Sequence, residues 1–257
     1  AAAHILVENS NDRPRAIVGQ DSRASGEFLE AAVVAGLTSA GVDVYRVGIV
    51  PTPAVAYLVA STGADLGVMI SASHNPMPDN GIKLFQRGGE KLADDVEALV
   101  EARIGEPWQR PTGTAVGRVI NEDQLVNKYI EHLLSTIDVS LSGLKVVVDC
   151  ANGASSFTAP IALSRAGAEV IAIANTPDGW NINDGVGSTH LDYLRNAVLK
   201  NGADVGIAHD GDADRCLAID ATGAEIDGDV IMAILAKGFK AQGKLKANTI
   251  VGTVMSN

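Results

Sequence analysis

Three aspartates stand at alternate positions in one short stretch of the chain, at Asp210, Asp212 and Asp214. They follow an apolar run that is typical of a β-strand, and small residues separate them. Carboxylates this close together repel one another unless a cation lies among them, and oxygen ligands at this spacing suit Mg²⁺ or Ca²⁺. The stretch is not an EF-hand, because Arg215 and Ala221 stand where that loop needs glycine and glutamate. We therefore predict a metal site, with a solvated acidic turn as the alternative.

A second candidate is Ser73, which follows the apolar run of residues 66–70 and precedes His74, Asn75 and Pro76. Proline cannot donate a backbone hydrogen bond, so the chain is expected to leave the sheet here and to present Ser73 at the carboxyl edge, where open α/β sheets bind ligands. Adjacent side chains in an extended chain point to opposite faces, which argues against a nucleophilic pair of Ser73 with His74. A capping or turn role for Ser73 is the alternative.

The serine and the aspartates also make chemical sense together. A phosphorylated serine carries a charge near −2 at neutral pH, and a metal held by aspartates leaves a position open for one phosphoryl oxygen. Phosphoryl transfer depends on charge neutralisation and in-line positioning more than on covalent chemistry. Lys83 and Arg215 are the cationic side chains available for that task.

The elements that must position these residues follow an α/β pattern, because valine- and isoleucine-rich runs alternate with helix-period stretches along the chain. A domain boundary is placed in residues 105–117, which hold prolines and glycines without an apolar period. The expected strands are residues 16–19, 42–47, 66–70, 81–85, 144–149, 169–174, 204–208, 216–220 and 248–253. The expected helices are residues 26–40, 53–61, 93–104, 122–135, 160–166 and 191–201, with one more beginning near residue 229.

Composition limits the partners. The chain has 20 basic and 31 acidic residues, a formal net charge of −11, so nucleic acid and anionic membrane surfaces are not expected to bind. It has no long uninterrupted apolar run and no signal-peptide pattern at its amino end, so a cytoplasmic location is expected. Cys150 and Cys216 lie in apolar, strand-like contexts and are expected to be reduced thiols in the core.

Several motifs at once resemble those of the α-D-phosphohexomutase superfamily. Residues 70–76 and 80–83 look like its active-site serine loop, and residues 210–215 look like its magnesium loop. Residues 18–23 and 51–53 are similar to parts of its first domain, although Gln20 stands where members commonly have arginine. The resemblance implies that Ser73 is the phosphoserine that gives and regains the phosphoryl group.

The resemblance also implies roles for the other candidates. Asp210, Asp212 and Asp214 would hold Mg²⁺ together with a phosphoryl oxygen on Ser73. Lys83 would carry the proton to and from the sugar hydroxyl. Two further side chains, His74 and Arg215, would make supporting contacts to the site.

Within the superfamily, the segments 177–179, 181–183 and 187–190 resemble the bacterial phosphoglucosamine mutases, as does Ser71. The implied reaction interconverts glucosamine 6-phosphate and glucosamine 1-phosphate through a 1,6-bisphosphate. The implied partners are a hexosamine phosphate substrate and a hexose 1,6-bisphosphate activator, and a homodimer is allowed. The alternatives are a phosphomannomutase or phosphoglucomutase with the same chemistry and a non-catalytic metal-binding fragment.

Such enzymes have four domains. The resemblance therefore implies two consecutive mixed-sheet α/β domains of phosphohexomutase type, residues 1–118 and 119–224, and the beginning of a third, residues 225–257. The family's sugar-recognition loop lies in the third domain and its phosphate-binding loop in the fourth, and neither motif is found in these 257 residues. The chain by itself is therefore expected to present the phosphoserine and the metal without turning over substrate.

Overall fold

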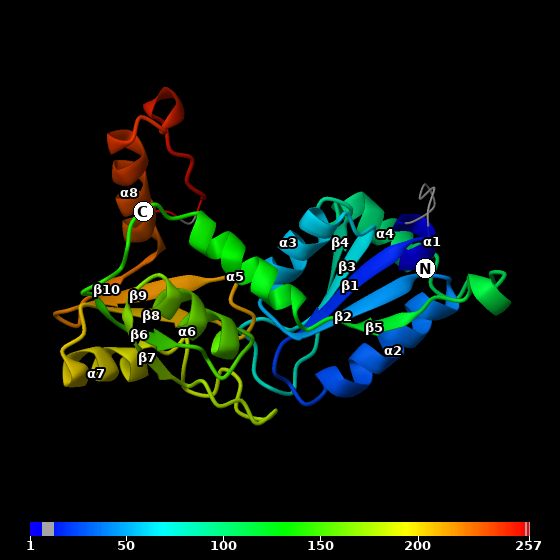
Figure 1. Cartoon of the computed structure of the whole chain (residues 1–257), viewed down its shortest axis with the longest axis horizontal. Coiled ribbons are helices and arrows are strands. Elements are labelled where there is room, and N and C mark those ends of the chain that lie inside the picture. The colour runs from blue at the N-terminus through cyan, green and yellow to red at the C-terminus, as the bar shows by residue number, and fades with distance from the viewer. Residues whose placement is uncertain (7–12, 255, 257) are drawn as a thin grey trace.

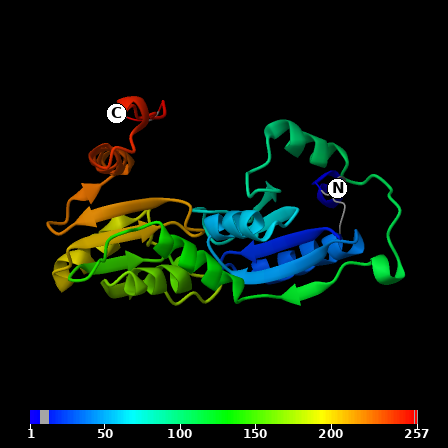
Figure 2. The same cartoon turned by 45° about the horizontal axis from the view of Figure 1, so that its top comes forward.

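A computed structural model of the chain describes residues 1–6, 13–254 and 256. It contains two five-stranded mixed sheets, each covered by helices, which lie side by side along the long axis of the molecule (Figures 1 and 2). These are two mixed-sheet α/β domains, as the sequence predicts. Among the described residues, none of the helices combines the length and the apolar character needed to cross a membrane.

The first sheet has the strand order β4-β3-β1-β2-β5, and its edge strand β4 alone is antiparallel to its neighbour. Every residue of β3 is buried, because strands flank it on both sides and helices cover both faces. Its strands are β1 (Arg15–Gln20), β2 (Asp43–Ile49), β3 (Leu66–Ile70), β4 (Ile82–Gln86) and β5 (Val119–Asn121). The segments around it are α1 (Ala2–Leu6), α2 (Gly26–Ser39), α3 (Thr52–Thr62), α4 (Asp94–Ala102) and the 3₁₀ turn Gly113–Ala115.

The second sheet has the order β10-β9-β8-β6-β7, in which β6, β7 and β8 are parallel and β9 and β10 are antiparallel additions. Its strands are β6 (Lys145–Asp149), β7 (Glu169–Ile173), β8 (Val205–His209), β9 (Cys216–Asp220) and β10 (Glu225–Ile226). The helices that follow the first sheet in the chain are α5 (Leu125–Ser135), α6 (Ser155–Arg165), α7 (Leu191–Asn201) and α8 (Gly228–Ala241), with a last 3₁₀ turn at Lys246–Asn248.

Local chemistry explains why the helices begin and end where they do. α3 starts at a segment with Pro51 and Pro53, whose fixed backbone angles suit a first helical turn. It ends at Gly63, whose φ of 67° lies in the left-handed region. α8 begins where the Asp227 side chain accepts a hydrogen bond from the backbone N–H of Val230 at 2.9 Å. Turn chemistry of this kind is readable from the sequence.

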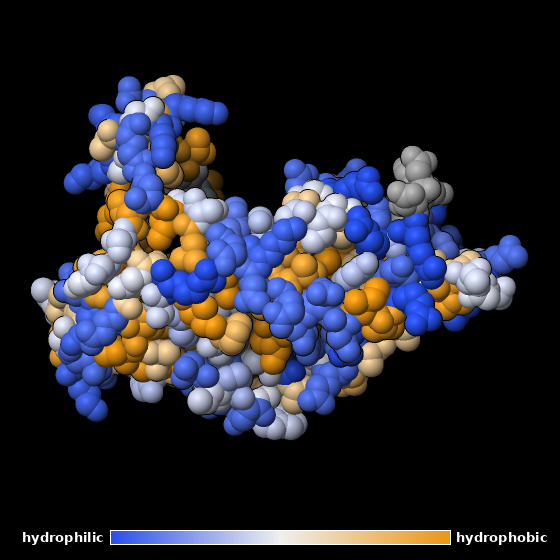
Figure 3. All heavy atoms as spheres, in the orientation of Figure 1, coloured by the Kyte–Doolittle hydropathy of each residue, from blue (hydrophilic) through white to orange (hydrophobic). Residues whose placement is uncertain are grey.

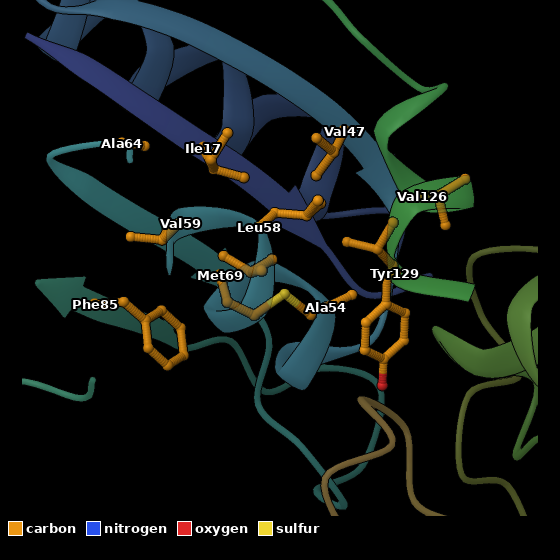
Figure 4. Close-up of a cluster of buried hydrophobic side chains, with 12 residues drawn as sticks. Ile17, Val47, Ala54, Leu58, Val59, Ala64, Met69, Phe85, Val126 and Tyr129 are labelled. Atoms are coloured by element: carbon orange, nitrogen blue, oxygen red, sulfur yellow. The ribbon is translucent and has the colours of Figure 1, made fainter. Parts of the chain in front are cut away.

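The helix α5 connects the two domains physically. Its residues Val126 and Tyr129 are buried in the apolar cluster under the first sheet, together with Leu58 of α3 and Met69 of β3 (Figure 4). The ring of His132, one turn further along α5, stacks on Tyr57 of α3 with 4.1 Å between ring centroids. The helix that we expected to lead into the second domain therefore also packs on the core of the first.

The sheets extend slightly past the expected boundaries. Val119–Asn121 pairs with β2 of the first sheet, three residues beyond the boundary expected after residue 118. Glu225–Ile226 pairs with β9 of the second sheet, beyond the boundary expected after residue 224. Both short strands escaped prediction because two or three residues are too few to show an alternating pattern.

The strand expected over residues 248–253 is wrong. After the 3₁₀ turn the chain is irregular, and Ile250 and Val251 are exposed. A strand needs a neighbour for its backbone groups, and none of the described strands pairs with this segment. The apolar side of α8 is exposed as well, at Val230, Ile234 and Phe239, and apolar atoms gather at the base of this helix (Figure 3).

Candidate active site

Ser73 lies just beyond the carboxyl end of β3 and reaches across to the second domain. Its hydroxyl donates a hydrogen bond to Asp210 Oδ2 at 2.6 Å. Its backbone has a φ of 54°, in the left-handed region that residues other than glycine seldom adopt. A strained conformation of this kind persists only where the surrounding structure holds it in place.

A buried set of side chains from the first domain holds the serine loop. Ser71 Oγ accepts a hydrogen bond from the Ser73 backbone N–H at 2.9 Å and donates one to Asp21 Oδ2 at 2.7 Å. Arg23 Nε donates to the same carboxylate oxygen at 3.0 Å, and the side chains of Asp21 and Arg23 are almost fully buried. Burial raises the pKa of Asp21, although the hydrogen bonds from Arg23 and Ser71 act in the opposite direction.

Two side chains from different domains bind the same pair of carbonyl groups in this loop. Arg23 Nη2 donates to the carbonyl oxygens of Ser73 at 3.2 Å and Asn75 at 2.8 Å. Asn183 Nδ2, which comes from the second domain, lies 2.9 Å from the first of these oxygens and 3.1 Å from the second. The serine loop is therefore held from both domains.

The aspartate loop, residues 210–215, connects β8 to β9 and faces the serine loop. Asp210 and Asp212 are buried, whereas Asp214 is exposed. Thr52, at the start of α3, ties this loop to the first domain, because its backbone N–H donates to the Asp212 carbonyl at 2.9 Å and its hydroxyl donates to the Asp212 carboxylate. Carboxylate oxygens of the three aspartates lie within 4.8 Å of one another.

The donor set fits a hard divalent cation. Three carboxylates supply oxygen ligands of the kind that Mg²⁺ and Ca²⁺ prefer. Asp212 Oδ1 is buried and has no hydrogen-bond partner among the described residues. A buried acceptor without a partner is costly, and a cation at this point would satisfy it. The acidic loop therefore fits a metal site.

Lys83 of β4 supplies positive charge to the same carboxylates. Its ammonium nitrogen lies 2.6 Å from Asp212 Oδ2 and 3.0 Å from Asp214 Oδ2. Partial burial by itself would lower the pKa of Lys83, but the hydrogen bonds and the attraction of Asp212 and Asp214 outweigh it and raise the pKa. The same contacts lower the pKa of Asp212 against the effect of its burial. Lys83 is therefore a protonated cation at neutral pH.

His74 and Arg215 meet at the open side of the site. Arg215 Nη1 lies 3.0 Å from His74 Nδ1, and Arg215 Nε lies 3.9 Å from Asp214 Oδ1. The argument that an extended chain separates Ser73 from His74 does not describe this loop, because the backbone of Ser73 is left-handed. The imidazole is nevertheless directed to Arg215, and Ser73 is directed to Asp210.

Sequence reasoning missed three side chains that shape this site, namely Arg23, Thr52 and Asn183. Each lies in a segment with a family-like motif, but no local spacing points to a role, because their partners are distant in the chain. One thiol was also misplaced. Cys150 is buried as expected, but Cys216, directly after the aspartate loop, is exposed and is not a core residue.

Two family models match the chain. Residues 1–110 match the phosphoglucomutase/phosphomannomutase alpha/beta/alpha domain I, and residues 127–223 match domain II of the same family.

Curated proteins named phosphoglucosamine mutase are similar over the whole chain. The protein from Streptomyces griseus is 61% identical over 265 residues, which cover 100% of this chain and 59% of that protein. The protein from Acidothermus cellulolyticus is 61% identical over 260 residues, which cover 56% of it. The chain thus spans a little over half the length of these relatives.

Solved structures show the same fold. A phosphoglucomutase/phosphomannomutase family protein from Burkholderia thailandensis superimposes with a TM-score of 0.79 at 26% identity, covering 94% of this chain and 54% of that one. An N-acetylphosphoglucosamine mutase from Aspergillus fumigatus, solved with GlcNAc-6P and magnesium, superimposes with a TM-score of 0.52 at 20% identity, covering 76% of this chain and 52% of that one.

Proposed function

The chain belongs to the phosphoglucomutase/phosphomannomutase family, and we propose that it carries the phosphoryl-transfer centre of a phosphoglucosamine mutase. Such an enzyme interconverts glucosamine 6-phosphate and glucosamine 1-phosphate. The name of the curated relatives at about 60% identity supports this choice within the family. The observation that carries the proposal is the contact of Ser73 Oγ with Asp210 at 2.6 Å, which joins a serine from one domain to the acidic loop of the other.

In the proposed reaction, phosphorylated Ser73 gives its phosphoryl group to a free hydroxyl of the sugar phosphate. The bond between phosphorus and the serine oxygen breaks, a bond to the sugar oxygen forms, and the proton of the sugar hydroxyl passes to the serine oxygen overall. The resulting 1,6-bisphosphate then reorients within the site and returns its other phosphoryl group to Ser73. In-line positioning and charge neutralisation account for most of the lowering of the activation barrier in such a transfer.

Lys83 is proposed as the proton carrier between the sugar and the serine. In its ammonium form, Lys83 would donate a proton to the serine oxygen as that oxygen leaves and would recover one from the attacking sugar hydroxyl, and the return step would run in the opposite direction. Arg215 and His74, at the open side, are proposed to contact the phosphate groups of the bound sugar. Their mutual contact at 3.0 Å places them beside each other within reach of the aspartate loop.

Magnesium is the proposed cation, held by Asp210, Asp212, Asp214 and a phosphoryl oxygen on Ser73. Mg²⁺ in this position would draw electron density from the phosphoryl group and offset the charge of its oxygens. The oxygen-only donor set and the unpartnered Asp212 Oδ1 support a hard cation. The fungal N-acetylphosphoglucosamine mutase, which shares the fold, was solved with magnesium.

A coupled assay on the full-length protein tests the function. Glucosamine, glucose and mannose phosphates are compared at saturating Mg²⁺ with a hexose 1,6-bisphosphate as activator, and the highest kcat/KM is expected for the glucosamine phosphate. A higher value for glucose or mannose phosphate would favour a phosphoglucomutase or phosphomannomutase. Mg²⁺ binding without phosphate ever appearing on Ser73 would favour a non-catalytic metal-binding module.

The 257 residues alone are proposed to be insufficient for turnover, because the relatives are much longer and the substrate phosphate needs a second anion site. The chain is expected to bind Mg²⁺ as the full-length protein does, with a mutase rate lower by several powers of ten. Comparable rates for the two would contradict this. A cytoplasmic location and a homodimer stay predictions.

A further inference from the structure

One amide group of the second domain is placed to control the conformation of the serine loop. Asn183 Nδ2 is within hydrogen-bond distance of both Ser73 O and Asn75 O, at 2.9 and 3.1 Å. A side-chain amide has two N–H bonds, so one nitrogen can serve two carbonyl oxygens at once. Asn183 is itself buried, and water is not a ready substitute for this donor.

We propose that Asn183 is a positioning residue for phosphoryl transfer, one that fixes the orientation of Ser73 whenever the two domains are docked. The proposal rests on the proposed function, in which Ser73 carries the phosphoryl group. It adds a residue from outside the serine and aspartate loops, and one that touches neither the metal ligands' carboxylates nor the hydroxyl that reacts.

The position of the Asn183 amide is set by a buried carboxylate. The backbone N–H of Asn183 donates to the Ala151 carbonyl at 2.9 Å. Asp149, fully buried at the carboxyl end of β6, accepts from the backbone N–H groups of Ala151 and Gly187, both at 2.9 Å. The loop that presents Asn183 is thus anchored on both sides to the second sheet, and the amide has little freedom to move.

The Ser73 carbonyl is enclosed between this amide and the aspartate loop. A Cβ atom added at Gly211 would lie 2.6 Å from Ser73 O and 2.6 Å from Asn183 Nδ2, so the space admits only glycine. The left-handed backbone of Ser73 needs such support, because it is unfavourable by itself. Without the amide, Arg23 would be the remaining side-chain donor to these two carbonyls, and we expect the Ser73 peptide to move relative to Asp210.

The test compares Asn183→Gly with Asn181→Ala in the full-length protein. Asn183 has a φ of 58°, which glycine adopts without strain, so Asn183→Gly removes the amide and keeps the backbone. Asn181 is the matched control, because its side chain bonds within the same loop, to Thr176 O at 3.1 Å and to the backbone N–H of Asp178 at 3.1 Å. Asn183→Asp is the second variant, which keeps the shape and replaces the donor by an acceptor.

We expect kcat to fall about 10- to 100-fold in both Asn183 variants, with KM within about twofold of wild type, because a displacement near 1 Å can cost about 100-fold. Asn181→Ala is expected to keep the wild-type kcat. An unchanged kcat in Asn183→Gly, a loss that lies wholly in KM, or an equal loss in Asn181→Ala would overturn the proposal.

Hydrogen exchange separates this proposal from the proposed function. In the 257-residue chain, the amides of residues 72–80 are expected to exchange at least about tenfold faster in Asn183→Gly than in wild type or Asn181→Ala. Equal exchange in all three proteins would overturn the positioning role whatever the enzyme does. The wild-type protein could lack mutase activity while Asn183→Gly still exchanges faster than wild type. This pair of results would refute the proposed function and support the contact between the domains.

Discussion

The site between the two domains has a buried wall and an exposed wall. The buried wall consists of Asp21, Arg23, Ser71 and Asn183. The other wall, called the exposed wall here, consists of the exposed Asp214 and Arg215 and the half-buried Lys83 and His74. The two arginines of the site show the contrast in exposure. The side chain of Arg23 is 2% exposed, whereas that of Arg215 is 56% exposed. Arg23 donates to a carboxylate and to three backbone carbonyls, whereas Arg215 has His74 and a carboxylate at 3.9 Å.

We interpret this difference as a division between residues that position the site and residues that react. Buried polar groups must keep their hydrogen bonds, so a wall built from them can hold a loop in only one conformation. Exposed cations lose little when they leave one partner for another, because water replaces the lost contact. We therefore expect changes on the buried wall to affect stability and geometry, and changes on the exposed wall to affect ligand and metal binding.

The largest effect is expected for Ser73→Ala, at the junction of the two walls. The substitution removes the oxygen that would accept the phosphoryl group and leaves the carbonyl contacts of the loop in place. Turnover of the full-length protein should fall by several powers of ten while the midpoint of unfolding changes little. Intact mass and peptide mapping after incubation with hexose 1,6-bisphosphate give the second readout. Phosphate on another residue, or full turnover in the variant, would contradict the assignment.

Next in size is the contrast between Arg23→Ala and Arg215→Ala. Loss of Arg23 leaves Asp21 buried without its cation, which should lower the free energy of unfolding by about 3 to 5 kcal/mol. Loss of the exposed Arg215 should change it by less than about 1 kcal/mol. Urea denaturation of the 257-residue chain, followed by circular dichroism, measures both. Similar losses for the two variants would remove the distinction between the walls.

The residues proposed to react were easier to identify from the sequence than the residues proposed to position them. Ser73 and the three aspartates stand out because unusual residue types follow apolar strands, and that pattern is local. The elements β3, α7 and β9 were predicted to the residue for the same reason. Arg23 and Asn183 gave no such signal, because their partners lie 50 and 110 positions away along the chain. The Arg23 contacts exist only once the first domain has folded, and the Asn183 contacts only once both domains have folded and docked.

The remaining errors arise from the same limit. An apolar run over residues 248–253 resembles a strand, but a strand is defined by its neighbour, and no described segment supplies one. Cys216 is the first residue of β9, and its exposure depends on which segments cover that end of the strand. Composition does not reveal this. Local pattern therefore identifies candidates, and tertiary contacts decide which of them form the buried wall.

The two walls also divide the aspartate loop, and the predicted metal site tests the division. Asp212 is fully buried and has an unpartnered oxygen, whereas Asp214 is exposed. Water screens a buried charge less than an exposed one, so the loss of the buried Asp212 charge should cost more metal affinity than the loss of the exposed Asp214 charge. Asp212→Asn should therefore weaken Mg²⁺ binding on the order of tenfold or more, and Asp214→Asn by less. Calorimetric titration of the 257-residue chain with MgCl₂ measures both. Unchanged Mg²⁺ binding in both variants would show that the loop is a solvated turn, and equal losses would remove the division within the loop.

The smallest expected effect has the opposite sign. Lys83 is a protonated cation that already neutralises Asp212 and Asp214, so Mg²⁺ must compete with its ammonium group for the same oxygens. Lys83→Met removes the charge and keeps most of the apolar stem. A partly exposed ion pair is worth up to about 1 kcal/mol, so Mg²⁺ should bind up to about fivefold more tightly once the competing ammonium group is removed. Lys83→Arg, which keeps the charge, is the matched control and should bind Mg²⁺ as wild type does. Turnover should nevertheless fall in Lys83→Met, because the proposed proton carrier is lost. A variant that binds Mg²⁺ more weakly than wild type would mean that Lys83 organises the carboxylates for the metal, and the exposed wall would then share the positioning role of the buried one.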